Sequence, residues 1–133
     1  MNKKIIGVVA CSAVAASMAI GASASDELIK VGYAQVGHES DWRTANTQNY
    51  QDVFSEENGY ELSFVDCDND NAAQIEAVRN FINQELDYIV IAPIQSAGWD
   101  TVLQEAQDAG IPVIIADREI EASEDLYLSL IHI

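Results

Sequence analysis

A chain of 133 residues is long enough for one modest domain, and an apolar share of 49% is enough to build a core. The net charge of -16, with 22 acidic and six basic residues, excludes the clustered lysines and arginines that phosphate binding requires. We therefore expect neither a nucleic acid nor an anionic membrane surface as a partner. The acidity itself is typical of a well-solvated, self-repelling surface.

Residues 1–24 have the pattern of a cleavable export signal. Lys3 and Lys4 form a positive start, small apolar residues follow through Ile20, and residues 22–24 form an A-x-A cleavage site. We therefore predict export to the periplasm or the cell surface, with no integral membrane span in the fragment. An alternative is a lipoprotein anchored at Cys11, because VVAC resembles a lipobox, but the apolar stretch before it is short.

The stretch from Leu28 to Arg43 predicts a strand that ends in a polar loop. Its apolar residues, too few for a helix, are Ile29, Val31, Tyr33, Ala34 and Val36. Gly37 interrupts this run, and residues 38–43 then place six polar or aromatic groups in one turn. Ligands of open parallel sheets bind at the carboxyl ends of strands, so we expect a site for a small polar ligand here.

The rest of the chain alternates between helical and strand patterns. We expect helices at 41–58, 68–84 and 99–109 and strands at 60–67, 88–93 and 112–116, with Asp41 as the first cap. In the first helix, Ala45, Tyr50, Val53 and Phe54 form a rough apolar stripe. Strand–helix alternation with short connections predicts the α/β class, with a doubly wound parallel sheet and right-handed crossovers.

The end of the chain departs from this alternation. Residues 126–133, LYLSLIHI, are apolar with no helix after them, and LSLIHI resembles the translation of an adapter used in sequencing libraries. We therefore expect the domain to occupy residues 25–125 and the tail at 126–133 to be non-native from about Leu128. A natural short strand is the alternative.

Two arginines stand at the expected carboxyl rim, in the loops at 37–43 and 117–118. Arg43 and Arg118 are two of only four basic residues after the export signal. Their placement suggests forked donors for ligand oxygens, or else structural ion pairs with Glu39 or Asp117. A third rim loop is expected at 95–98.

Trp42 lies beside acidic residues and an arginine, a combination that suits a sugar. A flat aromatic face can cover the apolar C–H face of a sugar ring, while carboxylates accept and guanidinium groups donate hydrogen bonds to its hydroxyls. The alternative for Trp42 is packing at a helix end. For Trp99, packing in the core or at an interface is the preferred interpretation.

Other motifs give little support for metal, cofactor or catalysis. Asp66, Asp68 and Asp70 have the spacing of a calcium loop, but the glycine and glutamate that must follow are absent, which favours capping. Cys67 is predicted to be a buried structural thiol. Neither GxGxxG nor GxxxxGK[ST] is present, so no nucleotide cofactor is expected. His38 and Glu39 are not completed into an active site, and we expect no enzyme.

The export signal together with IKVGYAQVGHESDWR, QIEAVRNFINQELDYIVIAPI and WDTVLQEAQDAGIPVIIADR resembles the amino-terminal lobe of type I periplasmic sugar-binding proteins of ABC transporters. The loop ESDWR, followed by API and GW, is similar to the galactofuranose-binding branch. The resemblance covers roughly residues 28–120. It implies a truncated type I lobe that captures a monosaccharide, expected to be a furanose such as galactofuranose, for an ABC transporter permease.

The resemblance also implies the site residues. Four side chains would hydrogen-bond the sugar, namely Glu39, Arg43, Asp117 and Arg118. Trp42 would pack against it. The candidates of second rank are Ser40, Asp41 and Gln95. Asp41 departs from the small residue of the galactofuranose branch. Because the family closes two lobes on its ligand, this chain alone should bind weakly or not at all. Alternatives are the sugar-sensing domain of a receptor or regulator, and an exported α/β enzyme.

Overall fold

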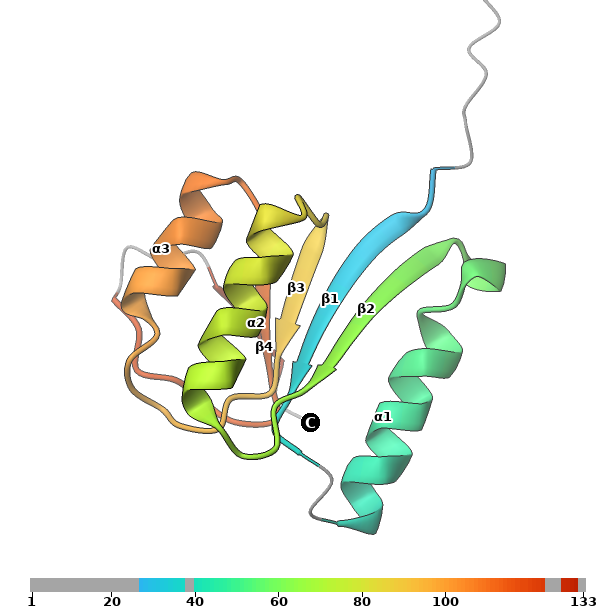
Figure 1. Cartoon of the computed structure of the whole chain (residues 1–133), viewed down its shortest axis with the longest axis horizontal. Coiled ribbons are helices and arrows are strands. Elements are labelled where there is room, and N and C mark those ends of the chain that lie inside the picture. Colours follow the sequence, from blue (N-terminus) through green and yellow to red (C-terminus); the bar gives the residue numbers. More distant parts are fainter. Residues whose placement is uncertain (1–26, 38–39, 124–127, 132–133) are drawn as a thin grey trace, which may run out of the picture.

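A parallel sheet with the strand order β2-β1-β3-β4-β5 forms the centre of the computed structural model, which describes residues 27–37, 40–123 and 128–131 (Figure 1). The strands are β1 (Ile29–Gln35), β2 (Tyr60–Asp66), β3 (Tyr88–Ile91), β4 (Val113–Ala116) and β5 (Leu128–Ile131). The helices are α1 (Asp41–Val53), α2 (Asn71–Asn83) and α3 (Asp100–Asp108), with a 3₁₀ turn at Glu56–Asn58. The predicted α/β class and doubly wound parallel sheet are confirmed.

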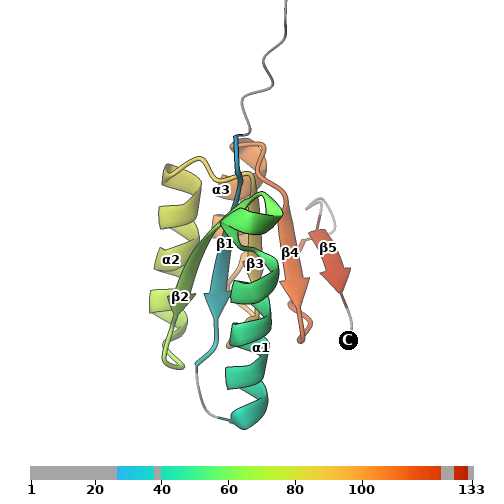
Figure 2. The ribbon, with the colours of Figure 1, turned by 90° about the vertical axis from the view of Figure 1, so that its right-hand side faces the viewer.

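Helices cover both faces of the sheet, α2 and α3 on one and α1 on the other (Figure 1, Figure 2). On the first face, Phe81 of α2 and Leu103 of α3 join Ile89 and Ile91 of β3 in one buried cluster. On the second face, Tyr50 of α1 and Phe54, which caps the end of that helix, pack against a cluster around β1. Strands β1 and β3 are therefore covered on both sides, as the unbroken apolar run of β3 predicts.

Helix α1 begins at Asp41 as predicted, but its predicted cap and its predicted end were wrong. Ser40, not Asp41, caps the helix, because its side-chain oxygen accepts a hydrogen bond from the Arg43 backbone N–H at 3.2 Å. The helix ends at Val53, and the chain then turns through the 3₁₀ segment to Gly59, whose φ is 87°. The predicted apolar stripe is also wrong in part, since Ala45 and Val53 are exposed. The buried residues of this helix are Arg43 and Thr47.

The second and third helices begin later than predicted. Asp68 and Asn69 have positive φ angles of 46° and 60°, which places them in a turn, and Asp70 caps α2 through the backbone N–H groups of Ala72 and Ala73. The capping alternative for the aspartates is thus confirmed. Trp99 stands at the N-cap of α3 and is fully buried, so its prediction as a core residue is confirmed.

Strand β5 pairs in parallel with β4, from Val113 opposite Leu128 to Ala116 opposite Ile131. Part of the predicted tail, at 126–127 and 132–133, lies outside the described residues, as do the export signal and Cys11. The assignment of residues 126–133 as non-native stays a prediction.

Gly32→Ala should destabilise the fold by about 3 kcal/mol, because a Cβ there would lie 2.6 Å from Cδ2 of the buried Phe81 ring and 3.0 Å from Cδ1 of Leu86. Gly110→Ala is the matched control: its φ is 73° but nothing lies within 4 Å of the added carbon, so about 1 kcal/mol is expected. Urea unfolding followed by circular dichroism measures both. An equal loss in the two variants would contradict the predicted clash.

Candidate functional site

The carboxyl edge of the sheet holds a topological switch point between β1 and β3. These strands are neighbours, yet the chain leaves β1 for β2 on one side and continues from β3 to β4 on the other. Connections that diverge in this way leave a crevice outside the strand ends, where ligands of doubly wound folds bind. The three loops predicted from the sequence all follow strands at this edge, which is the lower edge in Figure 1. We call this edge the rim.

An ion pair joins two sides of the rim. Nη2 of Arg43, in the first turn of α1, lies 2.6 Å from Oδ2 of Asp117, which follows β4. The Arg43 side chain is only 6% exposed and that of Asp117 is 31% exposed. Arg43 also stacks on its neighbour, with its guanidinium carbon 4.9 Å from the ring centre of Trp42. The structural ion pair that the sequence left open for Arg43 therefore forms with Asp117.

Asp117 occupies an unusual backbone conformation. Its φ is 72°, and the N–H of Arg118 donates a hydrogen bond to the carbonyl of Ala116 at 2.9 Å, which closes a three-residue turn. Turns of this hand are rare and strained, and strain of this kind is concentrated at functional sites. The turn places Nε of Arg118, half exposed, 3.8 Å from Oδ2 of Asp117. The Asp117 carboxylate thus lies beside two guanidinium groups, the buried one of Arg43 and the half-exposed one of Arg118.

A buried polar network fixes α1 against the end of β1. The Tyr33 hydroxyl lies 2.7 Å from Oε1 of Gln35 and 2.9 Å from Oδ1 of Asn46, and Nε2 of Gln35 donates to Oγ1 of Thr47 at 2.9 Å. Burial raises the pKa of Tyr33 far above its usual value, which keeps the hydroxyl neutral. The sequence analysis missed this network. Its signal was Gln35 at the end of an otherwise apolar run.

The remaining predicted site residues are exposed at the rim, used to cap a helix, or outside the described residues. Trp42 is 51% exposed, so its ring is accessible at the rim, and Asp41 is exposed beside it. Ser40 serves as the cap of α1. Gln95 is exposed on the loop after β3, and its carbonyl accepts a hydrogen bond from Nε1 of Trp99 at 2.8 Å. Glu39 lies outside the described residues.

The acidic loop after β2 and its cysteine form no metal centre. Among the residues that the structure describes, no group of three His, Cys, Asp or Glu side chains could hold a metal ion. Cys67 is buried, as predicted, and burial raises the pKa of its thiol to about 11.

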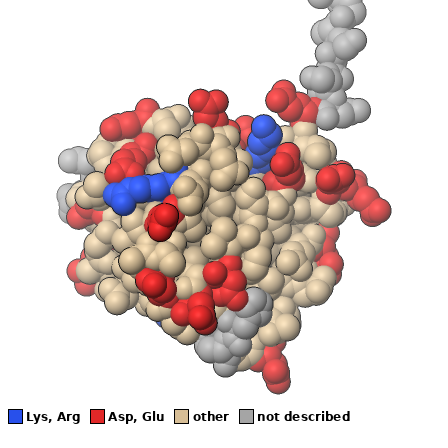
Figure 3. All heavy atoms as spheres, in the orientation of Figure 1, with Lys and Arg blue, Asp and Glu red and all other residues tan. Residues whose placement is uncertain are grey.

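The face in Figure 3 carries acidic side chains spread over it and few basic ones. None of the described helices is long and apolar enough to cross a membrane.

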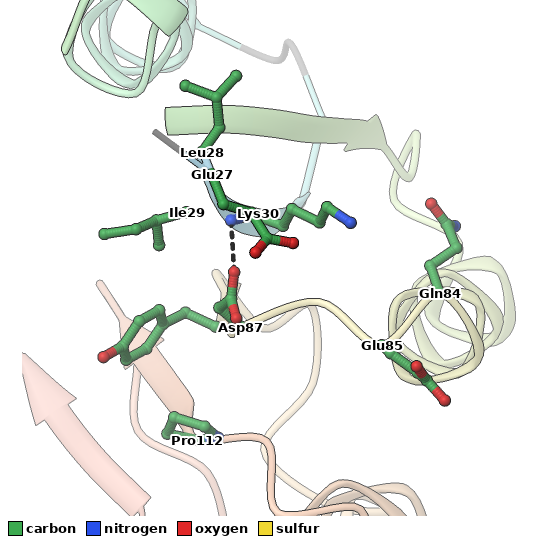
Figure 4. Close-up of a pocket in the computed structure, with 9 residues that line it drawn as sticks. Glu27, Leu28, Ile29, Lys30, Gln84, Glu85, Asp87 and Pro112 are labelled. Atoms are coloured by element: carbon green, nitrogen blue, oxygen red, sulfur yellow. Dashed lines mark hydrogen bonds between the residues drawn. The ribbon is translucent and has the colours of Figure 1, made fainter. Parts of the chain in front are cut away.

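A hollow of about 660 Å³ lies at the opposite, amino-terminal edge of the sheet (Figure 4). There the backbone N–H of Lys30 donates to Oδ2 of Asp87 at 2.7 Å. Its lining contains no rim residue, and consists of Glu27, Leu28, Ile29, Lys30, Gln84, Glu85, Asp87, Tyr88 and Pro112. Strand direction in the doubly wound fold favours the rim over this hollow as the ligand site.

The fold is that of one lobe of the doubly wound α/β class, with the rim as its candidate ligand site. A family model described as periplasmic binding protein domain matches residues 31–130, and the chain belongs to this family of solute-binding proteins. It is 41% identical to the galactofuranose-binding protein YtfQ of Escherichia coli K12 over 132 residues, which are 98% of this chain and 40% of that protein.

Solved structures of sugar-bound proteins are also similar to this chain in sequence and in fold. One from Mycobacterium smegmatis, in complex with β-D-fucofuranose, is 45% identical with a TM-score of 0.72, over 77% of this chain and 34% of that one. Another, the binding protein of the arabinose ABC transporter from Shewanella sp. ANA-3, bound to α- and β-L-arabinofuranose, is 44% identical with a TM-score of 0.68, over 72% of this chain and 32% of that one. The chain spans about 40% of the length of the curated relatives it matches.

Proposed function

We propose that this chain forms the amino-terminal lobe of an exported protein that binds a monosaccharide in its furanose form and delivers it to an ABC transporter permease. The observation that carries the proposal is the cluster of Arg43, Asp117 and Arg118 at the rim, with Trp42 exposed beside it. The relatives that bind galactofuranose, fucofuranose and arabinofuranose support the choice of a five-membered sugar ring.

Each group in the cluster has a distinct proposed role. The half-exposed guanidinium of Arg118 donates hydrogen bonds to sugar hydroxyls, and the oxygens of Asp117 accept from others. Arg43, buried beneath Asp117, orients that carboxylate. Trp42 covers the apolar face of the ring. Glu39, Ser40, Asp41 and Gln95 stay predicted contacts.

The proposed mechanism is capture by closure of two lobes, of which this chain supplies one wall. A single wall provides part of the contacts, so we expect dissociation constants on the order of 1 mM for the chain by itself. No covalent step is involved. Export through residues 1–24 is part of the proposal, with lipidation at Cys11 as the alternative route to the cell surface.

Arg118→Ala should weaken sugar binding at least tenfold, because a hydrogen bond from a charged donor contributes about 1.5–3 kcal/mol. The measurement is a titration of the ¹⁵N-labelled chain with L-arabinose, D-fucose and D-galactose, followed by NMR shifts of the rim amides. Arg79→Ala is the matched control, since Arg79 of α2 is exposed and pairs with Glu105 of α3, outside the rim cluster. Equal affinity in the Arg118 variant and the control would refute the assigned role of Arg118.

A further inference from the structure

Gln74 of α2 is fully buried, which is unusual for a glutamine on a helix that borders solvent. Its side-chain amide makes three hydrogen bonds with backbone groups. Nε2 donates to the carbonyl of Ala34 at 3.1 Å and to that of Ala92 at 2.7 Å, and Oε1 accepts from the N–H of Ile94 at 2.9 Å. Both ends of this amide are therefore used, and every contact lies at the carboxyl edge of the sheet.

The Gln74 amide takes the place of backbone hydrogen bonds where β1 and β3 separate. The pairing of β1 with β3 ends at Ala34 opposite Ile91, followed by one hydrogen bond from the Ala92 N–H to the Ala34 carbonyl at 3.1 Å. Beyond that point the two strands have no further rungs. Gln74 supplies the next donor and the next acceptor from a side chain. Without it, the buried carbonyl of Ala92 and the N–H of Ile94 would lose these partners.

The loop that begins at Ala92 is then fixed along its length. Near its start, the N–H of Ile94 donates to Oε1 of Gln74. Further along, Nε1 of Trp99 donates to the carbonyl of Gln95. The carbonyl of Ser96 then accepts from the N–H of Glu121 at 2.7 Å. The last contact joins this loop to the segment that follows Asp117 and Arg118. Gln74 thus lies at the base of a connected rim, although no atom of it reaches the exposed surface.

We propose that Gln74 is a positioning residue for the sugar site. It sets the separation of the loops that follow β1 and β3 and thereby places Gln95 relative to Arg43 and Trp42. This inference rests on the proposed function, since it assigns Gln74 a role in sugar binding without contact with the sugar. Binding of a small polyol depends on donors and acceptors held within a fraction of an ångström, so a loosened loop lowers affinity.

Gln74→Met tests the proposal, because methionine keeps an unbranched side chain but removes the donor and the acceptor. Gln51→Met is the control, on the exposed surface near the end of α1. The labelled chain is titrated with L-arabinose, and the exchange rate of the Ile94 N–H is compared with that of the Val90 N–H within β3. We expect a loss of affinity of at least fivefold in Gln74→Met, with faster exchange at Ile94 and little change at Val90.

Gln74→Glu provides a second readout that a loss of packing would not give. In its ionised form the introduced carboxylate faces two carbonyl oxygens and follows the acidic cap Asp70, so it cannot donate and it repels both carbonyls. Protonation restores one donor while one oxygen still accepts from Ile94. Because burial raises the pKa of a glutamate to about 8–9, affinity relative to the unmodified chain should recover as the pH falls from about 9 toward 7, whereas Gln51→Glu should show a flat ratio.

The possible outcomes separate the positioning role of Gln74 from the proposed function in sugar binding. Binding by the unmodified chain and the Gln51 variants, with weaker binding and faster Ile94 exchange in Gln74→Met, supports the positioning role. Equal affinity in Gln74→Met and Gln51→Met overturns that role and leaves the proposed function intact. No binding of L-arabinose, D-fucose or D-galactose by the unmodified chain at any accessible concentration overturns the millimolar sugar site proposed for this lobe, and the role of Gln74 in binding with it. If Gln74→Met does not fold, the pH ratio for Gln74→Glu decides.

Discussion

Trp99→Ala should lower the free energy of unfolding by about 3–5 kcal/mol, because it removes the largest fully buried side chain among the described residues. Trp99 packs in the cluster between the sheet and the helices α2 and α3, and its ring nitrogen holds the carbonyl of Gln95. The substitution leaves a cavity and an unpaired carbonyl at the start of the rim loop. Urea unfolding followed by circular dichroism measures the loss without depending on the tryptophan signal.

Trp99→Phe separates the two contributions. It keeps much of the ring volume but removes the Nε1 donor, so a smaller loss of about 1–3 kcal/mol is expected. A loss below about 1 kcal/mol in Trp99→Ala would contradict the central position assigned to this ring.

Asp117→Ala should lower stability by about 2–3 kcal/mol, which is less than the full effect of breaking a buried ion pair because Asp117 is 31% exposed. Arg43, nearly inaccessible to water, would lose its 2.6 Å carboxylate partner. Alanine gains nothing in return, since at a φ of 72° it is at least as strained as aspartate. Asp108→Ala, an exposed acid at the end of α3, is the control and should change stability by less than about 0.5 kcal/mol.

A double-mutant cycle with Arg43→Met measures the pair itself. If the ion pair joins the two sides of the rim, the double variant should lose about 1–3 kcal/mol less than the two single losses combined. Additive losses, again from urea unfolding, would show that Arg43 and Asp117 act independently. Sugar titration of the same variants should show weaker binding whenever Asp117 is replaced.

The sequence predicted the architecture well because the strands are encoded by contiguous apolar runs. The run at 88–93 is apolar throughout, and its core, Tyr88–Ile91, became the strand β3 covered by helices on both faces. Turn residues at Gly59 and Gly110, each with positive φ, marked where helical segments stop. Local patterns of this kind need no knowledge of distant contacts.

The site was predicted only in part, because its geometry depends on long-range contacts. The sequence indicated that Arg43 and Asp117 share a rim, but not that Arg43 would be buried beneath its partner. Gln74 was missed because a glutamine on a helix is normally solvated, and only the divergence of β1 from β3 creates buried backbone groups for it to satisfy. The cap of α1 was misplaced by one residue since Ser40 and Asp41 are both good caps.

The strand order has a consequence for how the chain matures. Among the described strands, the interior strand β1 is synthesised first, yet its second neighbour, β3, is complete only at Ile91. Until then β1 has one hydrogen-bonding edge without a partner, and closing the intervening segment costs chain entropy before any rung forms. Folding therefore waits for most of the lobe to be made. A delay of this kind would suit the export proposed above, in which the polypeptide passes through a translocation channel while still extended.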